Sequence, residues 1–185
     1  MTSKLNLIEV CLKRWPNVDP GDIEIWAGMG FNLIMYEAFR KDPSNFDLYA
    51  KEFKKVPVLK DPDTDEYYCL YPAKMCQVPD HAEGIRRIRK MKGNDLAFIP
   101  VQKDSVPVFN EMIPVFDLSI GYSCAPDKIV WERNPGVEFV RIDEVIAFEE
   151  YDMEDPIYIP MGQDDNLMTA IAKFIEGTPP ENIKP

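Results

Sequence analysis

The sequence predicts an α+β protein with helices at both ends and short β-strands in the middle. Apolar residues recur at spacings of three and four up to about residue 55 and again after about residue 163. Between these segments, apolar and polar residues alternate in short runs, and many of the 17 prolines stand between the runs. The hydrophobic content of 45% is enough for a packed core.

This pattern divides the chain into three expected segments within one compact unit. Residues 1–55 form a helical region, and residues 56–160 form an antiparallel β-sandwich-like domain. Residues 161–185 form a C-terminal amphipathic helix and an extended tail that pack on the rest.

The first predicted helix presents one apolar stripe and ends at Pro16. The residues of that stripe are Leu5, Ile8, Leu12 and Trp15. A second helix starts at Asp19, a good N-cap, followed by Pro20, whose missing N–H is harmless in the first helical position. It runs to Pro43, and its apolar residues cover more than one face: Ile23, Trp26, Ala27, Gly30, Leu33, Ile34, Met35 and Ala38.

A helix this apolar must be buried on several sides, by its own domain or by neighbouring subunits. Gly30 within it favours close helix packing. A short third helix follows Ser44, with Phe46, Tyr49 and Phe53 on one face.

The next segments change to the period of strands. We expect strands at residues 55–60, 66–71, 84–91, 96–102, 114–123, 128–133 and 136–148. A last helix is expected over residues 164–176, with Asp164 and Asp165 favouring its N-terminus and Gly177 ending it. Its apolar face carries Leu167, Ile171 and Phe174. The proline-rich tail is either a loose end or an arm that docks on a neighbour.

Charge and cysteine content exclude several function classes. The net charge of −11 disfavours binding to the outside of DNA, which needs clustered Lys and Arg. The one basic cluster, residues 86–92, is interpreted as the solvent face of a strand whose Ile88 points inward. The four cysteines lack C-x-x-C spacing and lie among apolar neighbours, which predicts buried, reduced thiols and an origin in the cytoplasm. No membrane span or secretory signal is expected.

No motif predicts catalysis, a cofactor or a metal. Asp61, Asp63 and Asp65 match the start of a calcium-binding EF-hand loop, but Glu66 and Pro72 stand where that loop needs Gly and Glu. A hairpin turn explains these aspartates better. The single histidine, His81, lies near Cys76, but nothing indicates that their side chains meet. We therefore expect a protein that is not an enzyme.

The central segment of the chain resembles a pattern found in virion structural proteins of crAss-like and related Bacteroidetes-infecting phages. The pieces of the pattern are Leu70-Tyr71-Pro72, then Val78-Pro79-Asp80, then Gly84-Ile85-Arg86-Arg87-Ile88. Residues 155–160, Asp-Pro-Ile-Tyr-Ile-Pro, precede an amphipathic helix at 166–176 and form a second similarity. With the N-terminal helices, these pieces cover most of the chain in the same order.

The resemblance implies a neck or ring protein of a tailed phage virion. Such a protein would form a homo-oligomeric ring, a dodecamer, between the portal and the tail and around the passing genomic DNA. It would contact portal and other neck or tail proteins, and the family offers no catalytic residues to carry over.

Two surfaces are expected to serve this role. The subunit-interface candidates are Trp26, Gly30, Phe174 and Ile183. The candidates for an acidic, lumen-facing patch are Glu149, Glu150, Asp152 and Glu154. Two alternatives stay open: a non-ring cytoplasmic adaptor that binds another protein, and a carboxylate-dependent metal enzyme that uses residues 61–66 and 149–155.

Overall fold

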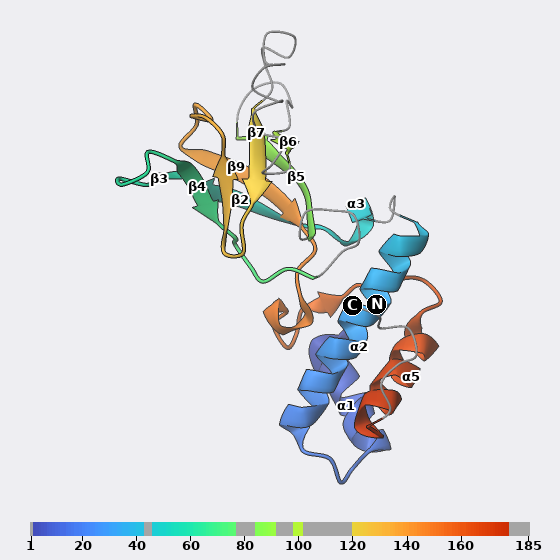
Figure 1. Cartoon of the computed structure of the whole chain (residues 1–185). Helices are drawn as coiled ribbons and strands as arrows, with labels where there is room; N and C mark the ends of the chain where they lie inside the picture. The colour runs from blue at the N-terminus through green and yellow to red at the C-terminus, as the bar shows by residue number, and fades with distance from the viewer. Residues whose placement is uncertain (1, 43–45, 77–83, 92–97, 102–119, 178–185) are drawn as a thin grey trace. The chain divides into compact units, whose positions relative to one another are not determined.

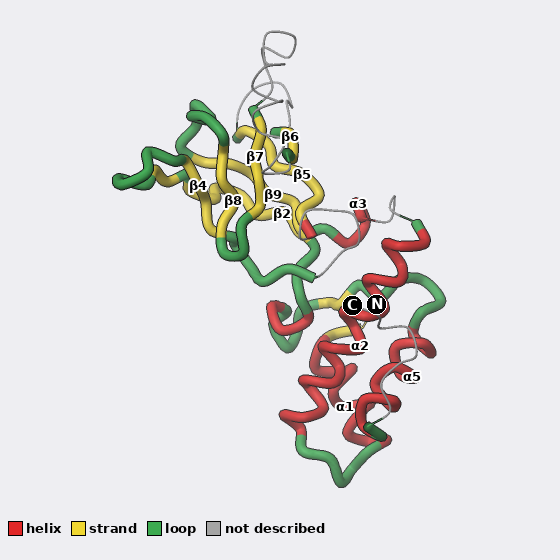
Figure 2. Tube along the Cα trace, in the orientation of Figure 1, coloured by secondary structure: helices red, strands yellow, loops and turns green. Residues whose placement is uncertain are grey.

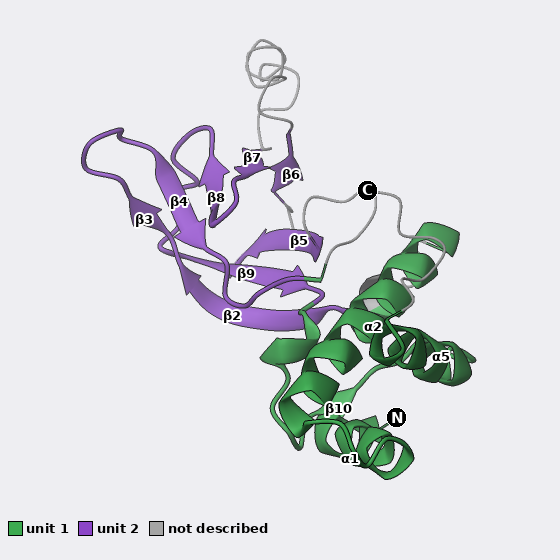
Figure 3. Ribbon diagram, turned by 60° about the horizontal axis from the view of Figure 1, so that its bottom comes forward, with its two compact units in different colours: residues 1–49, 76–79, 146–185 green, residues 50–75, 80–145 purple. Residues whose placement is uncertain are grey.

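The computed structural model describes residues 2–42, 46–76, 84–91, 98–101 and 120–177 (Figure 1). They form two compact units (Figure 3). Residues 1–49, 76–79 and 146–185 belong to the helical unit, and residues 50–75 and 80–145 belong to the β unit. The α+β class, with helices at both ends of the chain and strands between them, is confirmed (Figure 2).

The unit boundaries differ from the predicted ones at both ends of the β segment. The first long strand, β2 (Lys51–Pro57), begins early enough to include Phe53, which we expected in a helix. The β unit ends at Val145, so residues 146–160 belong to the helical unit instead. These residues include Phe148 and Tyr151, whose rings lie 5.7 and 5.8 Å from the ring of Phe31.

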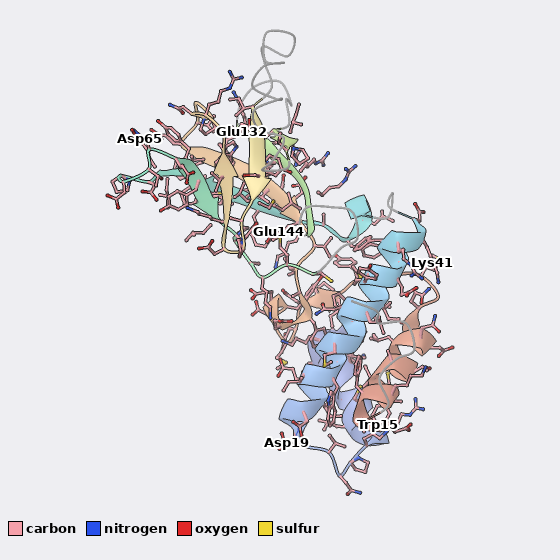
Figure 4. The ribbon with its side chains drawn as sticks, viewed as in Figure 1. Trp15, Asp19, Lys41, Asp65, Glu132 and Glu144 are labelled. Atoms are coloured by element: carbon pink, nitrogen blue, oxygen red, sulfur yellow. The ribbon has the colours of Figure 1, made fainter. Side chains whose placement is uncertain are left out.

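The helical unit is built around α2 (Pro20–Lys41), which Figure 4 shows running from Asp19 to Lys41. The predicted N-cap is confirmed, because Asp19 Oδ1 accepts a hydrogen bond of 2.8 Å from the Gly21 N–H and Pro20 begins the helix. Helices α1 (Lys4–Arg14) and α5 (Asp164–Ile175) and the 3-10 turn η5 (Phe148–Glu150) pack on α2. The short helix α3 (Phe46–Tyr49) and a strand pair, β1 (Thr2–Ser3) with β10 (Pro156–Ile157), complete the unit.

The buried face of α1 agrees only in part with the predicted stripe. Ile8 is buried as predicted and Leu12 and Trp15 are half-buried, but Leu5 is 42% exposed, whereas Lys4, Leu7 and Cys11 are buried. Lys4 can be buried because two partners compensate the cost of burying its charge. Its Nζ lies 2.7 Å from Glu24 Oε1 and 5.2 Å from the centre of the Phe148 ring. A prediction from side-chain polarity alone therefore placed the apolar stripe of α1 about one residue away from part of the buried face.

The C-terminal helix α5 follows its prediction. Leu167 and Ile171 are buried, and the helix ends where Gly177 adopts a φ of +70°, a left-handed conformation that favours glycine. The Gly177 N–H donates to the Phe174 carbonyl at 3.2 Å, which closes the last turn.

The β unit is a two-sheet sandwich with one shared core. One sheet has the order β2–β9–β5, where β9 spans Phe139–Glu144 and β5 spans Ile85–Lys90. The other has the order β3–β4–β8–β7–β6, formed by Leu59–Lys60, Tyr67–Leu70, Lys128–Trp131, Gly121–Cys124 and Ile99–Pro100. Within the described ranges, the strand pairs are antiparallel except β6 with β7, which is parallel and corrects the expectation of a purely antiparallel domain.

The core of the sandwich takes side chains from both sheets. Its residues are Val56, Cys69, Ile85, Ile88, Phe98, Tyr122, Ile129, Trp131, Val140 and Ile142. Ile88 is fully buried, which confirms its predicted inward direction. The predicted strands at 84–91 and 128–133 are confirmed nearly to their ends, while most of the one at 114–123 lies outside the described residues.

Candidate functional site

Gly30, a predicted subunit-interface residue, lies inside the chain's own helix packing. A Cβ atom at this position would come within 2.9 Å of Ile171 Cγ1 and 3.3 Å of Leu167 Cδ1 on α5. The absence of a side chain therefore lets α2 and α5 approach closely. Gly30 is buried and does not present a surface to a second copy, which corrects its assignment as an interface residue.

The other three interface candidates lie in different surroundings. Trp26 on α2 and Phe174 on α5 are each half-buried, so part of each side chain stays at the surface. Ile183 lies outside the described residues. Neither Trp26 nor Phe174 is among the most exposed apolar side chains of the residues that the structure describes.

A different set of α2 residues exposes apolar surface. Ile25 is 61% exposed, Met29 45% and Tyr36 39%. Their spacings of four and seven place them on one side of the helix. We call these three residues the α2 stripe. The sequence shows this spacing. It does not show which side of the long apolar helix is covered by other residues of the same chain. Met35, which we included in the excess apolar surface, is fully buried.

All four residues of the predicted acidic patch are exposed. Glu149 and Glu150 end η5, and Asp152 and Glu154 lie in the turn that follows. The turn is fixed to the helical unit by the buried rings of Phe148 and Tyr151, and the Asp155 N–H donates to the Asp152 carbonyl at 3.0 Å. We call the exposed carboxylates of Glu150, Asp152 and Glu154 the acidic turn.

The outer face of the three-stranded sheet carries a network of charges. Its members are Lys54, Arg87, Arg89 and Arg141, with the carboxylates Glu52 and Asp143 among them. We call this set the arginine face. Its sequence signal is alternation: Arg87, Arg141 and Asp143 flank the inward-pointing Ile88 and Ile142.

Asp143 is the centre of this network. Its carboxylate is 7% exposed, and Arg87 Nε donates to its Oδ2. Arg89 Nη2 donates to both of its oxygens, at 3.1 and 2.9 Å. Burial of this carboxylate is therefore compensated by charge-assisted hydrogen bonds from two guanidinium groups.

Arg89 and Arg141 are opposite each other across β5 and β9, a pairing of like charges that is unfavourable by itself. Glu52 from β2 relieves it, because its Oε1 lies 3.1 Å from Arg89 Nη2 and 3.3 Å from Arg141 Nε. Lys54 Nζ lies 3.4 Å from the other oxygen of Glu52. Each of the four cations in this set is thus paired with at least one of the two carboxylates.

The aspartate-rich segment after β3 is a hairpin turn, as the sequence favoured. Asp61 Oδ1 accepts hydrogen bonds from the backbone N–H groups of Asp63, at 2.9 Å, and Thr64, at 3.2 Å. These two N–H groups lower the pKa of the Asp61 carboxyl. Asp65, at the tip of the hairpin in Figure 4, pairs with Lys60 at 2.6 Å. Among the described residues, no group of three or more His, Cys, Asp or Glu side chains is placed to hold a metal ion.

Glu132 is a further acidic residue with unusual surroundings. It follows β8 (Figure 4) and borders an open hollow of about 970 Å³ on the five-stranded sheet. Both carboxylate oxygens are buried and accept no hydrogen bond within the described part of the chain. Burial raises the pKa of this carboxyl, so its neutral form is favoured more than in an ordinary glutamate.

Three of the four cysteines are buried, as predicted, and their thiols are poor nucleophiles. Burial raises the pKa of Cys69 and Cys76 to about 12 and that of Cys11 to about 11. The Cys76 thiol lies 3.4 Å from Asn32 Oδ1, and His81 is outside the described residues. A thiol held neutral in this way does not support a cysteine hydrolase.

We expect a disulfide-exchange reagent at about pH 8 to label the half-buried Cys124 first. Cys11, Cys69 and Cys76 should react only on unfolding, which mass spectrometry of the labelled chain would measure. Because their pKa values are raised, the folded state keeps protons that the unfolded thiols release above about pH 9. Stability should thus be unaffected by these groups below that pH and fall as pH rises toward 12. Rapid labelling of Cys76 in the folded chain would contradict this result.

No helix in the described ranges is both long enough and apolar enough to cross a membrane. Comparison with protein-family models finds no match for this chain, and comparison with curated proteins finds none either.

Proposed function

We propose that this chain is a structural subunit that assembles with copies of itself into the head-to-tail neck ring of a tailed phage virion. In this role it forms part of the DNA conduit and contacts the portal and other neck or tail proteins. The observation that carries the proposal of self-assembly is the α2 stripe. The location in the neck follows from the resemblance of the ordered proline and glycine motifs to those of crAss-like phage virion structural proteins.

The α2 stripe lies on the side of α2 that the chain's own core does not cover, which leaves it available to another protein chain. The opposite side of α2 is filled by the chain's own core, including Ile23, Phe31 and Met35. The exposed side nevertheless presents Ile25, Met29 and Tyr36 in line rather than singly. Lines of exposed apolar side chains on a rigid element are typical of protein interfaces, since each fully buried side chain stabilises an interface by about 1.5–3 kcal/mol.

We expect the double variant Ile25→Lys, Met29→Lys to assemble at least about tenfold more weakly than the wild type. Lysine keeps the helix propensity of the positions, so the loss reflects the surface and not the fold. Light scattering coupled to size-exclusion chromatography measures the mass, and thermal unfolding checks the fold. Met161→Lys, at a residue 98% exposed and outside the stripe, is the control and should assemble normally.

Normal assembly of the double variant would exclude the α2 stripe as the contact. Mass spectrometry and cryo-electron microscopy of purified virions test the location. A chain absent from the particles would refute the neck assignment and favour the non-ring adaptor, in which the same stripe binds a different protein.

A further inference from the structure

We propose that the proline-rich C-terminal segment of this chain, residues 178–185, docks in an apolar groove of the β unit. The groove has a volume of about 290 Å³ and is lined by residues of β2, β3 and the end of β4. The proposal goes beyond the neck assignment and does not depend on it, because it concerns which segment of the chain fills this groove.

The groove is lined mainly by aromatic, aliphatic and proline side chains. Leu70 is 55% exposed and Leu59 is 40% exposed. The half-buried ring of Tyr71 is held in place, because its hydroxyl donates to the Ala125 carbonyl at 2.7 Å. The other lining residues are Phe53, Lys54, Lys55, Val56, Pro57 and Pro72. Aromatic and apolar walls of this kind bind proline-rich segments, which lose little conformational freedom when they dock.

Lys55 places an unpaired cation at this groove. Strand β2 bulges here, since its pairing with β9 shifts register between Phe53 and Val56. Within the bulge, Lys55 takes a φ of 60°, a left-handed conformation that is unfavourable for a residue with a side chain. Lys54 pairs with Glu52 at 3.4 Å, whereas no carboxylate in the described part of the chain lies within ion-pair distance of the exposed Lys55. A carboxylate on a docked segment would neutralise this cation.

The C-terminal segment has the complementary composition. Residues 178–185 read Thr-Pro-Pro-Glu-Asn-Ile-Lys-Pro, so prolines fill three of the eight positions. A polyproline helix repeats every three residues, so in that conformation Pro180 and Ile183 share one side and Glu181 lies on another. The apolar pair then meets the groove walls, and Glu181 is the carboxylate for Lys55. Addition of the segment to the sheet as a strand is less suitable, because its prolines lack the N–H groups that strand pairing needs.

The segment is a better occupant than an unrelated protein because every copy of the chain supplies it. Each copy carries one segment and one groove, so the two are always present at equal concentration. The segment can come from the same copy or from a neighbour in an assembly, and the source is part of what the experiment measures.

Carbodiimide cross-linking of the full chain tests the contact. The reagent joins a lysine amine to a carboxylate with loss of water, and it adds no spacer, so only groups in contact react. We expect a cross-link between Lys55 and Glu181, identified by mass spectrometry after digestion. The exposed pair of Lys60 and Asp65, 2.6 Å apart, is the internal reference. In a mixture of unlabelled and nitrogen-15-labelled chains, mixed-isotope links arise only between copies.

Two variants remove the apolar part of the contact. Leu70→Asp places a charge on the groove wall and should lower the yield of the cross-link, relative to the reference, by at least about tenfold. Leu48→Asp is the matched control, because Leu48 is 69% exposed and lies outside the groove, and its yield should stay at the wild-type value. The second variant, Pro180→Gly with Ile183→Gly, leaves the groove intact and should lower the yield as well. Thermal unfolding checks the fold of each variant.

A charge reversal tests the ionic part of the contact. Glu181→Lys alone should abolish the cross-link, because two amines do not react. Glu181→Lys combined with Lys55→Glu restores one amine and one carboxylate at the contact, and the cross-link between the two positions should return.

The outcomes separate this inference from the proposed function. Cross-links from Glu181 to the exposed Lys13 and Lys41 as frequent as those to Lys55 would overturn the inference, and so would a full yield in folded Leu70→Asp chain. Links within one copy and links between copies both support docking. A wild type that stays monomeric but forms the link within one copy would therefore overturn self-assembly and leave this inference standing.

Discussion

Gly30→Leu is expected to destabilise the chain by about 3 kcal/mol, the upper range for overpacking a filled core. Even a Cβ atom here would stand 2.9 Å from Ile171 Cγ1, and Ile171 is fully buried. The leucine must push α5 away from α2 or leave its preferred rotamer. Urea unfolding monitored by circular dichroism measures the loss of stability.

Gly28→Ala is the matched control two residues earlier on the same helix. There a Cβ would lie 3.5 Å from Phe148 Cδ1, an ordinary van der Waals contact. Removing a glycine from a helix interior should therefore leave stability unchanged or raise it by up to about 1 kcal/mol. Equal effects at the two positions would show that Gly30 does not mark the close approach of α2 and α5.

Asp143→Ala is expected to be the second strongly destabilising change, by about 3 kcal/mol. It removes the carboxylate that binds Arg87 and Arg89 and leaves the largely buried Arg89 guanidinium with Glu52 as its one counter-charge among the described residues. Denaturant unfolding of the β unit, followed by the fluorescence of the buried Trp131, measures the effect.

Glu52→Ala provides the comparison within the same network. The Glu52 side chain is 34% exposed, so water can partly replace its ion pairs with Arg89, Arg141 and Lys54. Its loss should amount to no more than about 1 kcal/mol, as for partly exposed ion pairs. A loss at Glu52 as large as that at Asp143 would contradict a network centred on Asp143.

The strongest local signals in the sequence predicted their elements well. Asp19 and Pro20 marked the start of α2, and Gly177 marked the end of α5, because capping geometry depends on residues only a few positions apart. The alternation around Ile88 similarly predicted which side of β5 enters the core. For the candidate surfaces, the exposure of the acidic turn was the part that sequence reasoning identified in advance.

The failures share one cause, which is compensation by residues distant in the sequence. Lys4 is buried against expectation because Glu24 and Phe148 come to it from other elements. Residues 146–160 follow a strand and contain few helix signals, yet they join the helical unit because Phe148 and Tyr151 pack on Phe31. The close helix packing predicted at Gly30 is confirmed, but its prediction as a subunit-interface residue is wrong, because the sequence does not show that α5 covers it.

The sequence by itself determined the α+β class, the long second helix with its caps, the sandwich segment and the exposed acidic turn. These follow from periodicity, capping and charge, which act between near neighbours. Only the tertiary structure decided which side of α2 remains exposed, that Arg87 and Arg89 share Asp143, and which apolar residues are core. Those depend on contacts between residues far apart in the chain, such as Arg89 with Asp143, which no local pattern encodes.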